Sequence, residues 1–352
     1  MYYSKSFEKS KYFTKNFSPD IFLGYNVGMP FLEAVPNVSE GKNPAVLRAL
    51  EDLLRAAPRV RFLGADANAA ANRTVFTLAG EPGAVAGVLF DFIALSCRLI
   101  DMRTQHGTHP RLGAADVCPL VPLESISLAE CARLARALGR RVGTELGVPV
   151  YLYEAAAETP QRKNLAFIRK GEYEGLREKL RTLPPDFGPA QWTETAAKSG
   201  ACVIGARDIL IAFNINLNTQ DPAPAKIIAA KIRESSGGLK GVKAIGWYMG
   251  NFARAQVSCN ITDFRAAPLH AVYESCQQEA AALGLKATGC ELVGLAPLEA
   301  LLAAGRHYAP RETREDALIS AAVRGLHLTE VKPFDPREQI LEYKAGFRKS
   351  VF

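Results

Sequence analysis

Two of the five histidines in this 352-residue chain lie in one short segment, His106-Gly-Thr-His109-Pro-Arg-Leu-Gly-Ala-Ala-Asp116. The proline after His109 biases that residue away from helical geometry and glycines loosen both flanks, so we expect an irregular loop that displays the imidazole. Histidine titrates near neutral pH and suits general acid–base chemistry. A surface histidine bonded to the backbone is the alternative, and the pattern alone leaves it open.

The His-x-x-His spacing also invites a metal-site interpretation. On a helix this spacing would place both rings on one face, but the neighbouring glycine and proline predict a loop. No third His, Cys or Glu is spaced to complete a ligand set. We therefore predict that the protein uses no metal.

A second polar cluster lies between two expected strands and contains Asp66, Asn72 and Arg73. A carboxylate, an amide and a guanidinium at the end of paired strands can bind a ligand that has both cationic and anionic parts. A hairpin loop satisfied by its own Asp and Asn side chains is the alternative.

Two further segments are candidates for ligand contacts. The first comprises Glu33, or Asn37 with Ser39, Glu40 and Gly41, although a turn that enters a helix explains this spacing equally well. The second is the long loop 188–200, which carries Trp192 and Lys198 and would cover a flat aromatic ligand with an acidic tail. A disordered crossover remains the alternative for that loop.

The elements that would position these residues occur twice in one order. The first half predicts a strand at 31–37, a helix at 44–57, strands at 60–66 and 73–78, a helix at 82–98 and a strand at 114–120. The second predicts a strand at 209–217, a helix at 222–235, strands at 241–249 and 254–262, a helix at 268–283 and a strand at 286–294. This order predicts an α+β protein of two tandem ferredoxin-like (βαββαβ) subdomains that form a cleft.

The domain boundaries follow from composition. A helix with a capping box at Ser127 and Glu130 and a strand at 148–153 extend the first half, and the proline-rich segment from residue 184 is taken as the boundary. We predict an N-terminal extension at 1–30, subdomains at 31–183 and 184–330, and a C-terminal tail at 331–352. The extension does not resemble a targeting signal and is expected to be disordered or to reflect a misassigned start before Met29.

The bulk composition limits the class of protein. Hydrophobic residues at 48% and charged residues at 22% are typical of a globular protein. Seven cysteines without a C-x-x-C pair favour reduced thiols and a cytoplasmic location, and we expect no membrane-spanning segment. The net charge of +7 is scattered rather than clustered, which favours a small acidic ligand over nucleic acid.

Seven segments together resemble glutamate formiminotransferase, the formiminotransferase domain of the formiminotransferase-cyclodeaminase family. They include Gly107-Thr-His-Pro-Arg-Leu-Gly-Ala-Ala-Asp-Val-Cys-Pro119 and Ala212-Phe-Asn-Ile-Asn-Leu217, and the others span 33–42, 72–75, 147–153, 244–248 and 291–295. The resemblance implies a folate-binding transferase of two ferredoxin-like subdomains that works as a homodimer. Animal members are often fused to a cyclodeaminase, so a separate cyclodeaminase is an expected partner.

The implied reaction moves the formimino group of N-formimino-L-glutamate to tetrahydrofolate, giving 5-formiminotetrahydrofolate and L-glutamate in histidine degradation and one-carbon metabolism. Tetrahydrofolate is thus a co-substrate. The resemblance makes His109 catalytic as the group that moves protons. Asp66 would hold the amidinium or orient His109, and Arg73 and Arg111 would meet substrate carboxylates.

The remaining expected substrate and folate contacts are Asn37, Asn72, Gly188, Pro189, Trp192, Lys198 and Gly200. In the family the folate loop follows Asp-Phe-Gly-Pro, which maps to 188–200, but here the loop departs from the animal form. Formyl transfer between N-formylglutamate and 5-formyltetrahydrofolate is the closest alternative, because formyl and formimino carbons are nearly isosteric. An RNA-binding module is a distant one, since the usual aromatic strand motifs are absent.

Overall fold

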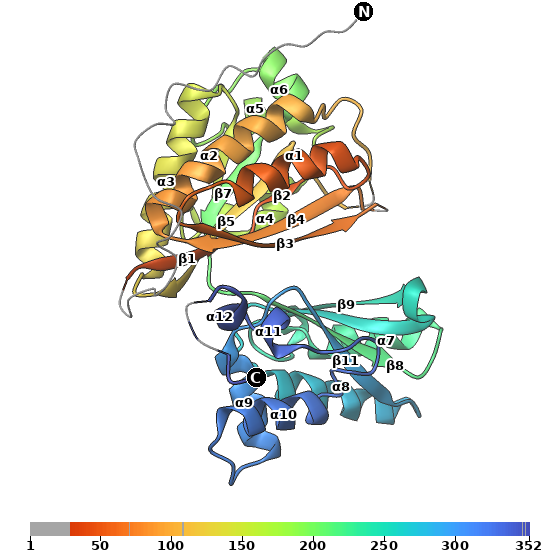
Figure 1. Cartoon of the computed structure of the whole chain (residues 1–352). Helices are drawn as coiled ribbons and strands as arrows, with labels where there is room; N and C mark the ends of the chain where they lie inside the picture. The colour runs from red at the N-terminus through yellow and green to blue at the C-terminus, as the bar shows by residue number, and fades with distance from the viewer. Residues whose placement is uncertain (1–28, 70, 108, 347, 349) are drawn as a thin grey trace, which may run out of the picture.

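The computed structural model describes residues 29–69, 71–107, 109–346, 348 and 350–352. The predicted N-terminal extension therefore lies almost entirely outside the described residues. The chain forms a mixed α+β structure with two sheets, stacked one above the other in Figure 1. In that view α1 and α2 lie above the first sheet and α8 to α10 lie below the second, so the opposite faces of the two sheets are turned towards each other.

The first unit contains the predicted β-α-β-β-α-β order and a further helix, strand and small helical segments. Its elements are β1 (Phe31–Ala34), β2 (Asn37–Val38), α1 (Pro44–Arg55), β3 (Val60–Asn68), β4 (Arg73–Gly80), α2 (Pro82–Leu99), β5 (Ala115–Glu124), α3 (Leu128–Glu145), β6 (Val150–Glu154), the short 3-10 helix Pro160–Lys163, α4 (Leu165–Arg169), α5 (Leu176–Thr182), α6 (Glu194–Ser199) and β7 (Cys202–Ala206).

The strand predicted at 31–37 is divided into β1 and β2 by Pro36, which has no N–H to give to a ladder. Both pieces pair antiparallel with β4 on one side and β5 on the other. With β3 beyond β4, the order across the sheet is β3, β4, β1 with β2, and β5. The central position of β1 and β2 brings the loops that follow β2, β3 and α2 to one end of the sheet.

The starts of two helices agree with the sequence signals. The Asn43 side chain accepts from Ala45 N–H at the start of α1, and proline follows at the first helical position. Both hydrogen bonds of the predicted capping box, between Ser127 and Glu130, are present at the start of α3. These helices bury Leu50, Leu54 and other apolar residues against one face of the first sheet.

The predicted boundary at residue 184 is wrong by about one helix and one strand. β7 follows that position, yet it pairs parallel with β5 and β6 and so completes the first sheet. β7 was not predicted from the sequence, because the run Cys202–Ala206 is only five residues long; like β5, it is buried on both faces. The first unit therefore extends to residue 206.

The second unit repeats the same order, as predicted. Its elements are β8 (Ile211–Leu217), α7 (Pro222–Ile232), β9 (Val242–Met249), β10 (Arg254–Ile261), α8 (Leu269–Ala282), β11 (Ala287–Val293), α9 (Leu298–Tyr308) and α10 (Glu315–Gly325), with short 3-10 turns at Glu234–Ser236 and Gly250–Phe252. The sheet order is β11, β8, β10, β9, with every neighbouring pair antiparallel. One face of this sheet packs on its helices through a core that includes Phe213 and Val257.

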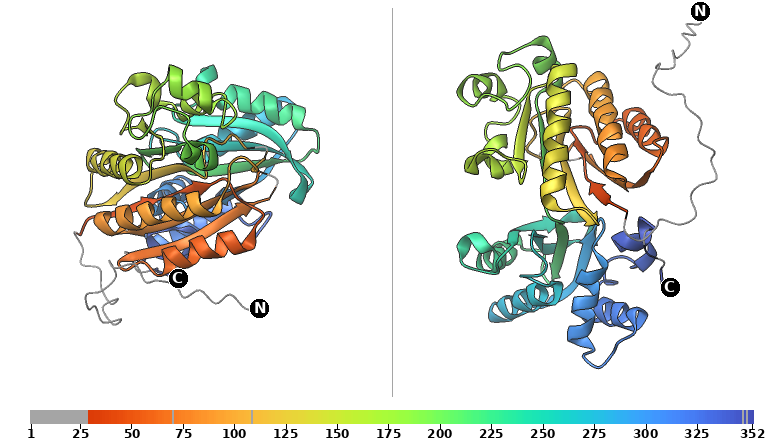
Figure 2. Two further views of the ribbon diagram at one scale, coloured as in Figure 1. Left: turned by 90° about the horizontal axis from the view of Figure 1, so that it is seen from above. Right: turned by 90° about the vertical axis from the view of Figure 1, so that its left-hand side faces the viewer.

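The predicted tail returns to the first unit. Its helices are α11 (Pro336–Gln339) and α12 (Leu341–Lys344), and the right-hand view in Figure 2 shows the C-terminal segment at the level of the joint between the units. Leu341 and Ala345 pack with Phe31, Leu63 and Ala79 of the first sheet. The tail is therefore part of the joint, not of the second unit alone.

One helix has the length and composition of a membrane-spanning segment, although none was expected from the sequence. Among the described residues, α2 alone has the length and apolar composition of a span. The core helix of a globular protein meets the same criteria, and α2 buries residues such as Leu89, Phe92 and Ile93 in the core of the first unit.

Candidate functional site

A cleft of about 720 Å³ lies between the two units. The first unit contributes residues from the His109 loop, the end of β6 and α4, and the second contributes residues from β9 and β10. Side chains on its walls include His109, Tyr153, Arg169, Arg207, Lys243 and Asn260. The cleft is thus lined by one imidazole, by four cations and by three carboxylates (Glu154, Glu172 and Asp208), and neither unit encloses it alone.

His109 is held through one ring nitrogen. Its Nδ1 lies 2.7 Å from the carbonyl oxygen of Pro110 and 3.3 Å from Nη1 of Arg73. The two partners demand opposite roles, since the carbonyl can only accept a hydrogen bond and the guanidinium can only donate one. Each contact therefore selects a different neutral tautomer of the ring.

The tautomer decides what Nε2 can do. When Nδ1 carries the proton and donates to Pro110, Nε2 has a free lone pair and is a base. When Nδ1 accepts from Arg73, Nε2 carries the proton and can donate a hydrogen bond. The arrangement provides both forms of one imidazole without a change of side-chain position.

The surroundings keep this imidazole neutral. Burial, together with the positive charge of Arg73, lowers the pKa of His109 from 6.5 to about 4. At neutral pH the ring therefore has a lone pair available on one nitrogen, which a protonated imidazolium would lack.

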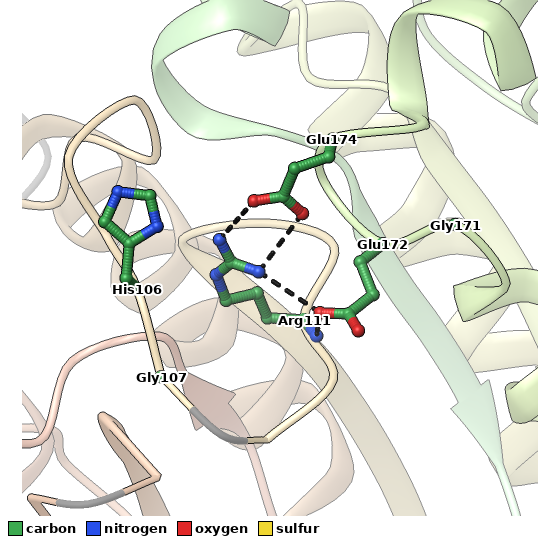
Figure 3. Close-up of a pocket in the computed structure, with 6 residues that line it drawn as sticks. All are labelled: His106, Gly107, Arg111, Gly171, Glu172 and Glu174. Carbon is green, nitrogen blue, oxygen red and sulfur yellow. Dashed lines mark hydrogen bonds and ion pairs between the residues drawn. The ribbon is translucent and has the colours of Figure 1, made fainter.

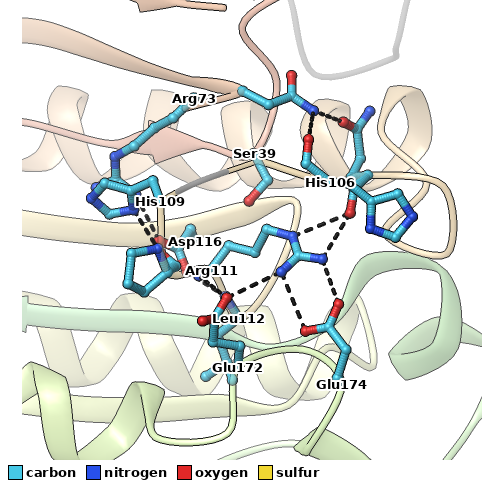
Figure 4. Close-up of polar contacts among 12 residues, drawn as sticks. Ser39, Arg73, His106, His109, Arg111, Leu112, Asp116, Glu172 and Glu174 are labelled. Carbon is cyan, nitrogen blue, oxygen red and sulfur yellow. Dashed lines mark hydrogen bonds and ion pairs between the residues drawn. The ribbon is translucent and has the colours of Figure 1, made fainter. Parts of the chain in front are cut away.

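Asp116 is the centre of the charged cluster behind His109 (Figure 4). Its fully buried carboxylate accepts from Arg73 at 2.8 Å, from Arg169, and from the backbone N–H of Leu112 at 2.7 Å. Burial opposes ionisation, but Arg169 and Arg73 outweigh it and hold the pKa of this carboxyl below its usual range. Asp116 thus fixes both Arg73 and the backbone just after His109.

Asn72 ties the histidine loop to the rest of the first unit. The residue has a positive φ of 47° and is 6% exposed. Its Oδ1 accepts from the N–H of Gly41, and its Nδ2 donates to Gln105 and to the backbone oxygen of His106. These buried contacts give Asn72 a structural role in the loop, where sequence analysis expected a substrate contact.

Arg111 is likewise engaged within the protein. Figure 3 shows its guanidinium between Glu172 and Glu174, beside a small pocket that His106 and Gly107 also line. Nε and Nη2 donate to the Gln105 carbonyl, while Nη1 and Nη2 donate to the two glutamates. All five guanidinium N–H bonds face these partners, so Arg111 would have to exchange one of them to meet a substrate carboxylate, and that role stays a prediction.

Three acidic or amide candidates lie in different surroundings. Asp66 is exposed near the end of β3, opposite Val75, and therefore shares a face of the sheet with Arg73. Asn37 is buried and donates to the backbone oxygen of Val35. Glu33 is buried under the tail, away from the cleft walls, with Arg207 and Glu342 nearby; burial chiefly raises its pKa to about 7.

The segment 188–200 forms a folded cover over the far side of the first unit, containing α6, and none of its residues lines the cleft. Trp192 packs near Tyr173, with ring centroids 6.1 Å apart, and Lys198 donates to the Arg98 carbonyl. Gly188 and Gly200 have positive φ values and approach the backbone closely. Pro189 follows the first of these turns. Gly200 pairs with Gly113, in the loop that carries His109, so the end of the segment contacts that loop. The expected folate contacts of the segment stay a prediction.

Sequence analysis missed four residues of the cleft region: Asp116 as an anchor, Arg169, Arg207 and Lys243. A charged residue at the start of the apolar run 114–120 was a usable signal for Asp116, because a carboxylate buried there needs a partner. Arg169 and Lys243 carried no such signal. Within the described part of the chain, no three His, Cys, Asp or Glu side chains are grouped as metal ligands.

Two family models match the two halves of the chain. One, described as the formiminotransferase domain, N-terminal subdomain, matches residues 31–207, and the other, described as the formiminotransferase domain, matches residues 212–346. Their boundary falls in the linker between β7 and β8 and agrees with the observed units.

Curated relatives give the same result. Glutamate formimidoyltransferase of Streptococcus pyogenes serotype M1 is 38% identical over 313 residues, covering 88% of this chain and 97% of that protein. The protein of the same name from Thermoplasma acidophilum is 40% identical over 284 residues, with 80% and 92% covered. The rat formimidoyltransferase-cyclodeaminase is 44% identical over 325 residues, but the chain spans only 59% of its length and 89% of itself. This chain belongs to the formiminotransferase family.

Proposed function

We propose that this protein is a glutamate formimidoyltransferase, which transfers the formimino group of N-formimino-L-glutamate to tetrahydrofolate. The observation that carries the proposal is a neutral imidazole, His109, with separate partners for its two tautomers, in a cleft between the units whose walls carry both cations and carboxylates. Two relatives that this chain covers over most of their length are named for this activity.

The reaction needs a proton removed and a proton delivered. As N5 of tetrahydrofolate attacks the amidine carbon, the attacking nitrogen must lose a proton, and the departing glutamate nitrogen must gain one. Nε2 of His109 accepts the first proton while Nδ1–H donates to Pro110. The same Nε2 then returns a proton to the leaving nitrogen, and such catalysis contributes about 10²- to 10⁴-fold.

The cationic groups suit the anionic ends of both substrates. Arg207 and Lys243 line the cleft from opposite sides and are proposed to meet carboxylates in place of Arg111. Arg73 is proposed to act on His109 and the nearby amidine. Asp66 faces the same side of the sheet and remains a candidate to stabilise the amidinium charge.

Several broader features belong to the same proposal. The sheet orders β5–β1/β2–β4–β3 and β11–β8–β10–β9 support two ferredoxin-like subdomains, the first enlarged by β6 and β7. A cytoplasmic homodimer that uses no metal and binds neither nucleic acid nor membrane is proposed, with histidine degradation as its setting. The names of the animal relatives support a separate cyclodeaminase as a partner.

The test is a spectrophotometric assay with tetrahydrofolate and N-formimino-L-glutamate, run on the wild type and on His109→Ala. The wild type should form 5-formiminotetrahydrofolate, and the variant should lose at least about 10²-fold in kcat while still binding tetrahydrofolate. Full activity of the variant would reject the role of His109. Preference for N-formylglutamate as donor would instead identify a formyltransferase.

A further inference from the structure

The described residues form two sheets with four edges, and three of these edges are covered or interrupted by the chain itself. At the edge of β6, the Val150 N–H donates to the Phe187 carbonyl. At the edge of β11, the Cys290 N–H donates to the His327 carbonyl. The edge of β3 is interrupted by a register shift next to Gly64, and such a bulge twists an edge away from partners. The fourth edge is β9, labelled in Figure 1, which pairs with β10 from end to end without a shift, and a long, regular edge of this kind can add another strand.

The free backbone groups of β9 can be identified from one hydrogen bond. The Thr262 N–H donates to the Gly241 carbonyl at 2.7 Å, in register with the ladder that joins β9 to β10. Because alternate residues of an antiparallel strand bond to the same neighbour, odd-numbered residues of β9 bond to β10 and even-numbered ones point away from the sheet. Of these, Val242 already donates its N–H to the Leu239 carbonyl. The outward backbone groups that no other described residue bonds are those of Ala244, Gly246 and Tyr248.

The side chains of β9 beside these free groups are apolar and exposed. On the open face of the sheet, Ile245 is 59% exposed and Trp247 is 40% exposed. The Trp247 Nε1–H already donates to Oε1 of Gln256 at 2.9 Å, so an apolar partner can cover the indole without breaking a hydrogen bond. Large apolar side chains next to each other on one face indicate a contact surface.

Both the free backbone groups and the exposed side chains are arranged symmetrically about Gly246. Ala244 and Tyr248 lie two positions on either side of it, and Ile245 and Trp247 lie one position on either side. When a second copy of β9 is laid antiparallel with Gly246 opposite Gly246, each outward N–H therefore meets an outward C=O. On the open face, Ile245 of each copy lies opposite Trp247 of the other, and aromatic–β-branched pairs of this kind stabilise antiparallel strands. The edge is thus complementary to itself, as a two-fold interface requires.

We propose that β9 pairs with β9 of a second copy of this chain, antiparallel and centred on Gly246, so that the second sheets of the two copies become one continuous sheet. A homodimer is already part of the proposed function; this inference adds the surface that forms it and rests on the strand edge, not on the reaction. In the same register Met249 of the second copy lies opposite Lys243, which lines the cleft, so the interface reaches the cleft wall. The two-fold pattern favours a second copy over an unrelated extended peptide.

The first experiment measures the dimer dissociation constant of the full chain by sedimentation equilibrium, and the wild type should be a dimer. Ile245→Glu combined with Trp247→Glu replaces both apolar cross-strand pairs by pairs of like charge, which should raise the dissociation constant about 10-fold or more. Ile245→Glu combined with Trp247→Lys makes the facing charges opposite, so this variant should dimerise at least about 5-fold more tightly than the first double variant. The matched control Leu283→Glu, at an exposed apolar residue after α8, should leave the constant unchanged.

The second experiment tests the register by cross-linking. Facing residues of a non-hydrogen-bonded antiparallel pair have Cα atoms about 4.5 Å apart, a distance that a disulfide can bridge. Ile245→Cys combined with Trp247→Cys should therefore form a covalent dimer on oxidation with copper phenanthroline, seen on a non-reducing gel. Ile245→Cys alone should form none, because the two copies of this residue lie diagonally, about 7–8 Å apart. The wild type gives the background, since its seven cysteines are buried or half-buried.

The possible outcomes separate the interface from the reaction. A wild type that stays monomeric at every concentration measured rejects the interface together with the homodimer, whereas the transferase assay decides the reaction by itself. If the wild type is a dimer and Ile245→Glu combined with Trp247→Glu leaves the dissociation constant unchanged, the dimer forms elsewhere and the β9 interface is rejected. A covalent dimer of Ile245→Cys alone would reject the register centred on Gly246. If the charged variants fail to fold, as judged by circular dichroism, the absence of a cross-link in the paired cysteine variant still rejects the interface.

Discussion

The two units share one strand order but use it differently. The first places its polar groups in loops at one end of the sheet, where Asp116, Arg73 and Asn72 are buried and depend on each other for hydrogen bonds. The second presents exposed side chains from the middle of β9, such as Lys243 and Ile245, on an open face. Buried, mutually dependent groups fix a reacting residue precisely, whereas a strand face offers area for binding and tolerates change.

Of the substitutions considered, Asp116→Asn should cause the largest loss of stability, because it removes the carboxylate at the centre of the buried cluster. The amide keeps the shape but leaves Arg73 and Arg169 as two buried like charges, so unfolding in denaturant should show a loss of about 3–5 kcal/mol. The matched control Asp101→Asn removes a carboxylate from a surface pair with Arg103 and should cost no more than about 1 kcal/mol. If both substitutions lowered the free energy of unfolding by the same amount, the buried ion pairs of Asp116 would contribute no more to stability than the surface pair of Asp101.

Arg73→Met should shift the pH dependence of turnover. With the wild-type pKa of His109 near 4, the base is kept as pH falls from 7 and is lost only near pH 4. Removing the Arg73 charge should raise that pKa towards 6.5, so the acid limb of kcat/KM should move upwards. Arg103→Met, at the surface, should leave the limb in place. An unmoved limb in Arg73→Met would show that burial alone keeps the ring neutral.

Glu33→Gln tests the joint between the units and should affect turnover least. The folded-state pKa of about 7 lies above the unfolded value near 4.5, so this carboxyl's contribution to stability is full below pH 4.5 and is lost as pH rises through 7. The free energy of unfolding of the glutamine variant should therefore be up to about 3 kcal/mol higher than that of the wild type at pH 8. At pH 4.5 the two values should be equal. The control Glu124→Gln, at an exposed position, should show no such difference between the two pH values. If Glu33→Gln also changed the unfolding free energy equally at pH 4.5 and pH 8, Glu33 would not have a raised pKa in the folded protein.

Sequence patterns predicted most of the fold because local signals were strong. Pro44 and Pro82 mark helix starts, and apolar, β-branched or aromatic runs indicated the four strands of each repeated order. β7 was not predicted because it is only five residues long, and its parallel pairing with β5 joins residues far apart in the chain. The domain boundary was misplaced for the same reason.

The site was only partly predictable. Loop composition singled out His109, and its place in the cleft agrees with the expected display. Sequence could not show that Arg111 is occupied by Glu172 and Glu174, because these partners lie more than 60 residues away.

The return of α12 to the first sheet has a mechanical consequence. The units are joined once by the backbone between β7 and β8 and a second time by Leu341 and Ala345, which sit among first-unit side chains. Ile209, in that backbone linker, packs against the same apolar cluster, so the two connections meet in one place. Any change in the angle between the units must therefore deform or expose this cluster, which makes the joint resistant to movement.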